Sequence, residues 1–321
     1  MAHVDKNGMI RGKAGSVIYR TYGKKNLIQG KPKAFKQTQE SIKTSTEFGL
    51  SSSTAAIIRR AFDPAYLFRD GAAVSRSTRY VYHSIRNSAS AAVGKRDLHD
   101  ADLSYLNGME FNADSQLADV LRVVPQVLQS AEGKISVTLP ELNTQTDIKK
   151  PKWLNEQSNK YRIRLTLVAF NFREEYYEHL DIQDIDLDKY DTLAGQTVTF
   201  NGTINPACIL MVSMSLLFYK YVNATQEYVL LNCKAFSPCA IIGTFQSPEP
   251  ADYPKEAIDK TAQGYPVEKG HIYDMGYLGN TLMQGLSSRI DRYASTASKK
   301  LSPFSTVHAV VLGERVSFKQ E

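Results

Sequence analysis

The longest apolar run in this sequence is Ala207-Cys208-Ile209-Leu210-Met211-Val212-Ser213-Met214-Ser215-Leu216-Leu217-Phe218-Tyr219. It is short for a membrane helix, serines interrupt it, and Asn205-Pro206 and Lys220 border it. An apolar run of this kind is typical of a strand, or a pair of strands, buried on both faces. It therefore predicts the centre of a buried sheet, and we expect no membrane span.

Neighbouring segments alternate apolar and polar residues with a period of two, which is typical of strands. They lie at 135–139, 161–170, 196–200 and 228–245, and turn residues separate them. No helical pattern lies between these segments. The sequence therefore predicts an antiparallel β-sandwich or barrel over residues 134–246.

Residues 37–133 show helical periodicity instead. The spacing predicts helices over about 38–62, from Ser75 to Gly94, and over about 114–130, where Pro125 kinks or divides the last one. The mainly helical region and the strand-rich region together predict an α+β protein.

Residues 247–321 form the last predicted region, which mixes several kinds of structure. It begins with a proline-rich connector, continues with a helix over about 281–299 and ends with a strand over 307–312. That strand needs a partner, which is either its own sheet or a neighbouring subunit.

Positive charge is concentrated at the N-terminus. Residues 1–36 hold nine Lys or Arg and one acid, so their net charge of +8 exceeds the +6 of the whole chain. Residues 97–321 carry a net charge of −7. Five glycines and Pro32 disfavour a helix in residues 1–36, although residues 9–22 contain one or two short strand-like pieces. We expect an extended basic arm that becomes ordered when it meets a partner.

Two kinds of partner suit such an arm: the acidic body of another copy, or nucleic acid. The residues expected to contact either one are Arg11, Lys13, Arg20, Lys24, Lys25, Lys31, Lys33, Arg76, Arg79 and Arg86. We therefore expect a non-enzymatic structural subunit that self-assembles into a filament, tube or particle. The alternative is a sequence-independent nucleic-acid-binding protein, and a third option is a carbohydrate-binding or enzymatic β-sandwich.

Patterns that indicate an enzyme are missing from the sequence. The segment Gly8 to Ala14 departs from the P-loop in its spacing and lacks its hydroxyl residue. The histidines are scattered and have no nucleophile motif beside them. No catalytic residue and no cofactor are predicted.

The sharpest ionic cluster lies in residues 181–191. There Asp184, Asp186 and Asp188 alternate, so their carboxylates would point to one side of an extended loop and gather oxygens for a calcium ion. The segment lacks the glycine and glutamate positions of an EF-hand loop. An acidic solvated edge, or a docking site for a basic arm, is the preferred interpretation.

The cysteines and the N-terminus bear on the compartment. Cys208, Cys233 and Cys239 are odd in number and show no C-x-x-C spacing, which is typical of buried free thiols in a reducing compartment. Residues 1–36 contain no apolar run of the secretory type. We expect cytoplasmic synthesis, with the final location open and an assembled particle or filament as one alternative.

One resemblance concerns the N-terminus. Residues 9–20, Met-Ile-Arg-Gly-Lys-Ala-Gly-Ser-Val-Ile-Tyr-Arg, are followed by Pro32, Thr38 and Phe48-Gly49. This pattern resembles the G-K-x-G-S-V-x-Y-R signature of an uncharacterised family of Bacteroidota proteins, often present in several copies per genome and sometimes encoded near phage-like genes. The resemblance covers roughly the first 60 residues. It implies no activity and no catalytic residue.

Overall fold

The computed structural model describes residues 2–22, 25–30, 37–248 and 272–298. The chain divides into two compact units. One unit, the body, comprises residues 39–292, and the other comprises residues 1–38 and 293–321.

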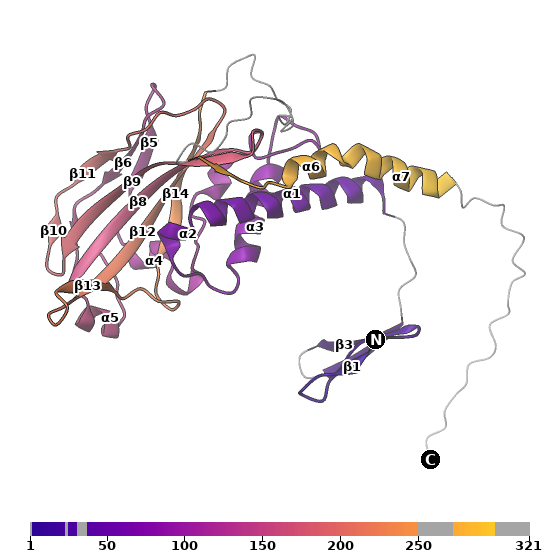
Figure 1. Ribbon diagram of the computed structural model, residues 1–321, viewed down its shortest axis with the longest axis horizontal. Coiled ribbons are helices and arrows are strands. Elements are labelled where there is room, and N and C mark those ends of the chain that lie inside the picture. The colour runs from indigo at the N-terminus through magenta and orange to yellow at the C-terminus, as the bar shows by residue number, and fades with distance from the viewer. Residues whose placement is uncertain (1, 23–24, 31–36, 249–271, 299–321) are drawn as a thin grey trace, which may run out of the picture. The chain divides into compact units, whose positions relative to one another are not determined.

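The body is built on a curled, six-stranded antiparallel sheet (Figure 1). Its central strand is the predicted apolar run, β12 (Ile209–Val222). One edge of β12 pairs with β8, and the other edge pairs with β14 over its first half and with β13 over its second. The remaining strands follow β8 in the order β9, β15. The bounds are β8 (Lys160–Asn171), β9 (Tyr176–Asp188), β13 (Glu227–Leu230), β14 (Cys239–Gln246) and β15 (Ile272–Asp274).

A smaller antiparallel sheet covers one face of this main sheet. It has the strand order β11, β6, β5. Leu210 and Val212 of β12 point to this side and share an apolar core with Val137 of β6. The bounds are β5 (Gln126–Gln129), β6 (Ile135–Leu139) and β11 (Gln196–Thr199), and a separate pair consists of β7 (Leu142–Asn143) and β10 (Thr192–Leu193).

Helices cover part of the opposite face. Ile209 and Met211 of β12 share a second apolar core with Ile58 and Phe62 of the helical layer. The layer consists of α1 (Gln39–Ala61), α2 (Asp63–Tyr66) and α3 (Ala73–Arg86). The α+β class and the antiparallel strands are confirmed, but the sheet is a half-barrel with helices on one face.

The predicted helices agree with the structure to different extents. The helix expected over 38–62 is α1, and the one expected from Ser75 is α3, which begins at Ala73 and ends at Arg86. The one expected over 281–299 is interrupted at Gly285, giving α6 (Gly279–Gln284) and α7 (Leu286–Ser298).

The prediction of a helix over 114–130 is wrong. After the short 3-10 turn η1 (Leu103–Leu106), only the 3-10 turn η2 (Ala113–Ser115) and the short helix α4 (Leu117–Val120) form in this region, followed by β5. Pro125 cannot donate to a helix interior, and after it Val127 packs on the core while Leu128 is exposed, which is strand alternation.

The N-terminal region differs from the expected extended arm. Residues 3–22 and 25–30 contain a four-stranded antiparallel sheet with the order β1 to β4. Gly8 and Gly15 adopt φ angles of 74° and 58°, so these glycines build tight turns rather than a loose linker. The strands are β1 (His3–Val4), β2 (Ile10–Ala14), β3 (Val17–Tyr22) and β4 (Lys25–Gly30).

Three other expectations can be compared with the described residues. No helix among them is long and apolar enough to cross a membrane. All three cysteines are free; Cys208 and Cys239 are buried and Cys233 is half-buried. The strand expected over 307–312 and most of the proline-rich connector lie outside the described residues.

Candidate functional surfaces

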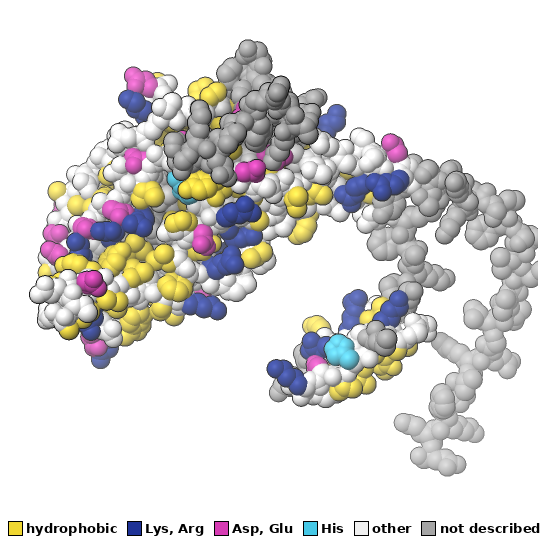
Figure 2. Space-filling model, viewed as in Figure 1, with side chains coloured by type: hydrophobic (Ala, Val, Ile, Leu, Met, Phe, Trp, Pro, Cys, Tyr) yellow, Lys and Arg dark blue, Asp and Glu magenta, His cyan; other side chains and the backbone are white. Residues whose placement is uncertain are grey.

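The N-terminal sheet has two chemically different faces. Residues directly opposite each other in an antiparallel pair share a face. Tyr19 lies opposite Ile28, and Arg20 lies opposite Leu27. The first face, which we call the uncharged face, carries Ala14, Val17, Tyr19, Thr21, Asn26 and Ile28. The second, the basic face, carries Lys13, Ile18, Arg20, Tyr22, Lys25, Leu27 and Gln29. In Figure 2 the basic side chains of this sheet lie mostly on one side and hydrophobic ones on the other.

Neither face forms a core with the described residues of this unit. All six residues of β4 are exposed, with Ile28 at 68% and Leu27 at 49%. No hydrophobic residue in the described part of residues 2–30 is buried. A small sheet needs a packed hydrophobic face to be stable, and the described residues of this unit do not supply one.

The basic residues expected to make contacts in this region are only partly gathered. Lys13, Arg20 and Lys25 share the basic face. Arg11 forms an ion pair with Asp5 at 3.0 Å. The other three, Lys24, Lys31 and Lys33, lie outside the described residues.

Arg76 of α3 is not part of an exposed basic surface. Its Nε donates to the Glu110 carbonyl at 2.9 Å, and its Nη2 donates to Asp70 Oδ2 at 2.5 Å. Burial opposes the charge of Asp70, but this bond and backbone donations from Ala113 and Ala72 outweigh it and lower the Asp70 pKa to about 2. Arg76 therefore joins α3 to the segment that follows it.

The other two arginines of α3 are exposed. Arg79 and Arg86 are seven residues apart, so they lie on one face of the helix. The Arg86 guanidinium lies 5.9 Å from the ring centre of Tyr82, which contacts the half-exposed Phe48 edge-on at 5.8 Å. This surface mixes basic and aromatic groups.

The acidic cluster forms an ionic ladder on the main sheet rather than a loop. As expected, Asp184 and Asp186 point to one side of their strand, β9. On β8, however, Arg164 Nε and Nη2 both lie 2.7 Å from the Asp184 carboxylate, and Arg162 binds Asp186 in the same way at 2.6 and 3.0 Å. These bonds lower the Asp186 pKa to about 2, mainly through Arg162.

The ladder leaves little of the calcium site that the alternating aspartates suggested as an alternative. Lys160 adds a third cation, 2.9 Å from Asp186, and Asp188 lies opposite Lys160 at the exposed end of β9. In Figure 2 basic and acidic side chains lie side by side over this part of the body. The described residues contain no group of three or more side chains suited to a metal ion.

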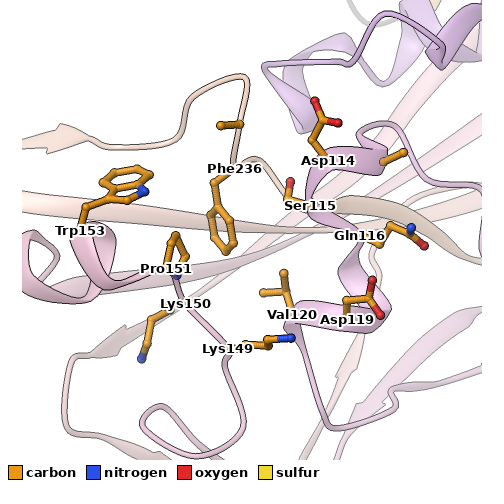
Figure 3. Close-up of a pocket in the computed structure, with 12 residues that line it drawn as sticks. Asp114, Ser115, Gln116, Asp119, Val120, Lys149, Lys150, Pro151, Trp153 and Phe236 are labelled. Carbon is orange, nitrogen blue, oxygen red and sulfur yellow. The ribbon is translucent and has the colours of Figure 1, made fainter.

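A groove on the body gathers residues that are far apart in the sequence (Figure 3). It has a volume of about 490 Å³ and is lined by residues of η2 and α4, by the 149–153 segment and by Ala235 and Phe236. We call it the Trp153 groove, because Trp153 of α5 (Lys152–Gln157) is the only tryptophan of the chain.

Hydrogen bonds from backbone N–H groups fix the three segments of the Trp153 groove. Lys149 N donates to Val120 O at 2.8 Å and joins the second segment to the first. Ser237 N donates to Ser115 Oγ at 2.8 Å and joins the third to the first. Leu154 and Val120 anchor the walls in the apolar core. The groove is therefore formed before any ligand arrives.

Lys149 and Lys150 differ in their surroundings. Lys150 Nζ donates to Thr144 O at 2.5 Å and lies 4.6 Å from the ring centre of Tyr161, and burial lowers its pKa to about 8. Lys149 makes no side-chain bond to a described residue, and Figure 3 shows it pointing toward the Asp119 side of the groove. The sequence contains one signal for this groove, a lone tryptophan at the end of the segment Lys149-Lys150-Pro151-Lys152-Trp153.

Comparisons with known proteins do not add to this picture. No family model, no curated protein and no solved structure matches the chain. Its function is therefore inferred from its own residues and their geometry.

Proposed function

We propose that this protein is a non-enzymatic structural subunit that assembles with copies of itself through the N-terminal sheet. The observation that carries the proposal is the exposure of that sheet, whose apolar side chains form no core with the described residues of their own unit. Exposed apolar surface of this kind commonly marks a protein interface. A second copy of the chain is the occupant that we propose.

Charge complementarity supports a second copy as the partner. Residues 1–38 carry a net charge of +8, whereas residues 39–292 hold 26 basic and 30 acidic residues and so carry −4. Opposite net charges favour contact between the sheet of one copy and the body of the next. Contacts between unlike surfaces generate rings or open filaments rather than closed dimers.

Two adjacent residues of β4 provide a matched test. Ile28→Lys places a charge on the uncharged face, and Leu27→Lys places the same charge on the basic face. We expect Ile28→Lys to abolish assembly in sedimentation velocity and negative-stain microscopy, because burying an unpaired charge is costly. Leu27→Lys should still assemble. Equal assembly by the wild type and both variants would contradict the proposal.

Sequence-independent binding of nucleic acid is the second candidate. It is favoured by the gathering of Lys13, Arg20 and Lys25 on one face of the sheet. The triple substitution of these residues by Glu separates the two functions. If it removes a gel shift of single-stranded or duplex DNA while assembly persists, the basic face binds nucleic acid. Such a shift should also weaken steeply with added salt.

A further inference from the structure

We propose that the Trp153 groove binds an uncharged saccharide chain. This inference goes beyond self-assembly, because the groove belongs to the body and uses no residue of the N-terminal sheet.

One side of the groove is apolar and partly aromatic. Figure 3 shows Trp153, Pro151 and Phe236 on the same side of the groove. Trp153 remains 37% exposed although α5 is anchored by the fully buried Leu154. The face of an aromatic ring is electron-rich and attracts polarised C–H groups, which the flat side of a sugar ring presents.

The opposite side of the groove is polar, with side chains that have no partner among the described residues. Asp114, Gln116 and Asp119 line it in Figure 3, with Lys149 beside them. None of these four side chains makes a hydrogen bond or ion pair to another described residue. They offer carboxylate acceptors, ammonium donors and an amide that does both. Sugar hydroxyls, which also donate and accept, match this set.

The balance of charge favours a neutral ligand. Two carboxylates, on Asp114 and Asp119, and the ammonium group of Lys149 line the groove, whereas the ammonium of Lys150 is bonded to Thr144 O and points away from it. A polyanion such as nucleic acid would meet both carboxylates, and a polycation would meet Lys149. An uncharged ligand with many hydroxyls avoids both conflicts.

The size of the groove suits more than one sugar ring. Its volume of about 490 Å³ falls within the roughly 300–1,000 Å³ of small-molecule sites. It also opens to solvent, so the chain on either side of the bound rings can continue outward. We therefore infer an oligosaccharide or polysaccharide as the ligand.

The single tryptophan provides a direct assay on the full-length protein. Fluorescence of Trp153 is followed during separate titrations with cellohexaose, chitohexaose, maltohexaose and xylohexaose. At least one of them is expected to produce a saturable change at millimolar concentration or below. Because the chain has no other tryptophan, the signal reports on this groove alone.

Calorimetry with the responding saccharide then tests the two sides of the groove. Trp153→Ala should weaken binding roughly tenfold or more, as for aromatic anchors at other interfaces. The double variant Gln116→Ala/Asp119→Asn, which alters side chains bonded to no described residue, should weaken it roughly threefold to tenfold. Tyr190→Ala, at a tyrosine that is 81% exposed and outside the groove, should bind like the wild type.

Three results would overturn the inference. One is the absence of a saturable change with all four hexasaccharides. Another is unchanged binding in both groove variants. The third is a response to hexalysine or to inorganic phosphate in place of the saccharides, which would assign the groove to a charged ligand.

Discussion

Strands β12 and β4 are both antiparallel, but their surroundings are opposite. No residue of Ile209–Phe218 in β12 is more than 3% exposed, whereas every residue of β4 is exposed. The small sheet and the helical layer together cover both faces of β12. The sheet of the body is therefore completed by its own chain, and the N-terminal sheet is not completed by the described residues of its unit.

The sequences of the two strands reflect this difference. Strand β12 is apolar without alternation, as expected of a strand buried on two sides. Strand β4 reads Lys-Asn-Leu-Ile-Gln-Gly, with two apolar residues that point to opposite faces. The two strands therefore differ in burial rather than in β propensity. This difference in burial predicts measurable differences in stability.

The largest consequence concerns truncation of an apolar side chain in each strand. Leu210→Ala in β12 should lower the free energy of unfolding by about 2–5 kcal/mol, because it leaves a cavity in the core. Ile28→Ala in β4 should change it by no more than about 0.5 kcal/mol. Urea unfolding followed by Trp153 fluorescence measures both. A similar loss in the two variants would make the N-terminal sheet part of the same core.

The second-largest expected effect on stability is a dependence on pH that comes from the buried Glu110 of the body. Glu110 is 9% exposed, and burial raises its pKa to about 7 although Oε1 accepts from Leu117 N at 2.9 Å. The folded state therefore holds a proton that the unfolded state releases near pH 4.5. The contribution of Glu110 to stability is therefore greatest below that pH and falls as the pH rises to about 7.

Substitution of Glu110 isolates this effect. At a pH of about 8, Glu110→Gln should be more stable than the wild type by up to about 3 kcal/mol, and at a pH of about 4 the two should be similar. Thermal or urea unfolding at both pH values measures the difference. The control is Glu132→Gln, whose side chain is 80% exposed. A pH-independent difference for Glu110→Gln would show that the acid is charged in the folded state.

The ionic ladder lies between these extremes of burial. Asp184 binds Arg164 in a bidentate manner and is 3.0 Å from Arg162, with side chains about a quarter exposed. Asp184→Asn should cost about 1 kcal/mol, since exposed pairs contribute little and networks somewhat more. Urea unfolding at low and high salt checks this, because salt should shrink the difference. A cost that is unaffected by salt would indicate hydrogen bonding alone.

The comparison also explains what the sequence could and could not predict. Strand β12 and helix α1 followed from local patterns, because each buries a long apolar segment. The third helix failed because Leu117, Val120 and Leu128 are spaced as on one helical face, although they belong to a short helix and a strand. Local spacing cannot reveal where Pro125 changes the structure.

The candidate sites could not be predicted fully from local sequence, because they depend on contacts between residues that are far apart in the chain. Alternation predicted that Asp184 and Asp186 share a side, but their arginine partners follow only from the pairing of β8 with β9. The Trp153 groove joins three segments that are separated by about thirty to eighty residues in the sequence. The glycines of residues 1–36 were interpreted as a linker, although two of them occupy turns of a sheet.

The smallest expected change in stability is the most informative about the N-terminal sheet. Deletion of residues 1–36 should alter the free energy of unfolding of the body by no more than about 0.5 kcal/mol, because its two apolar cores contain no residue of that region. The same deletion should abolish assembly in negative-stain microscopy. Together these results would identify the sheet as an interface, since an element that supports assembly without supporting the fold acts between subunits. A loss of several kcal/mol would instead make it a structural part of the body, and the failure of Ile28→Lys to assemble would then reflect misfolding.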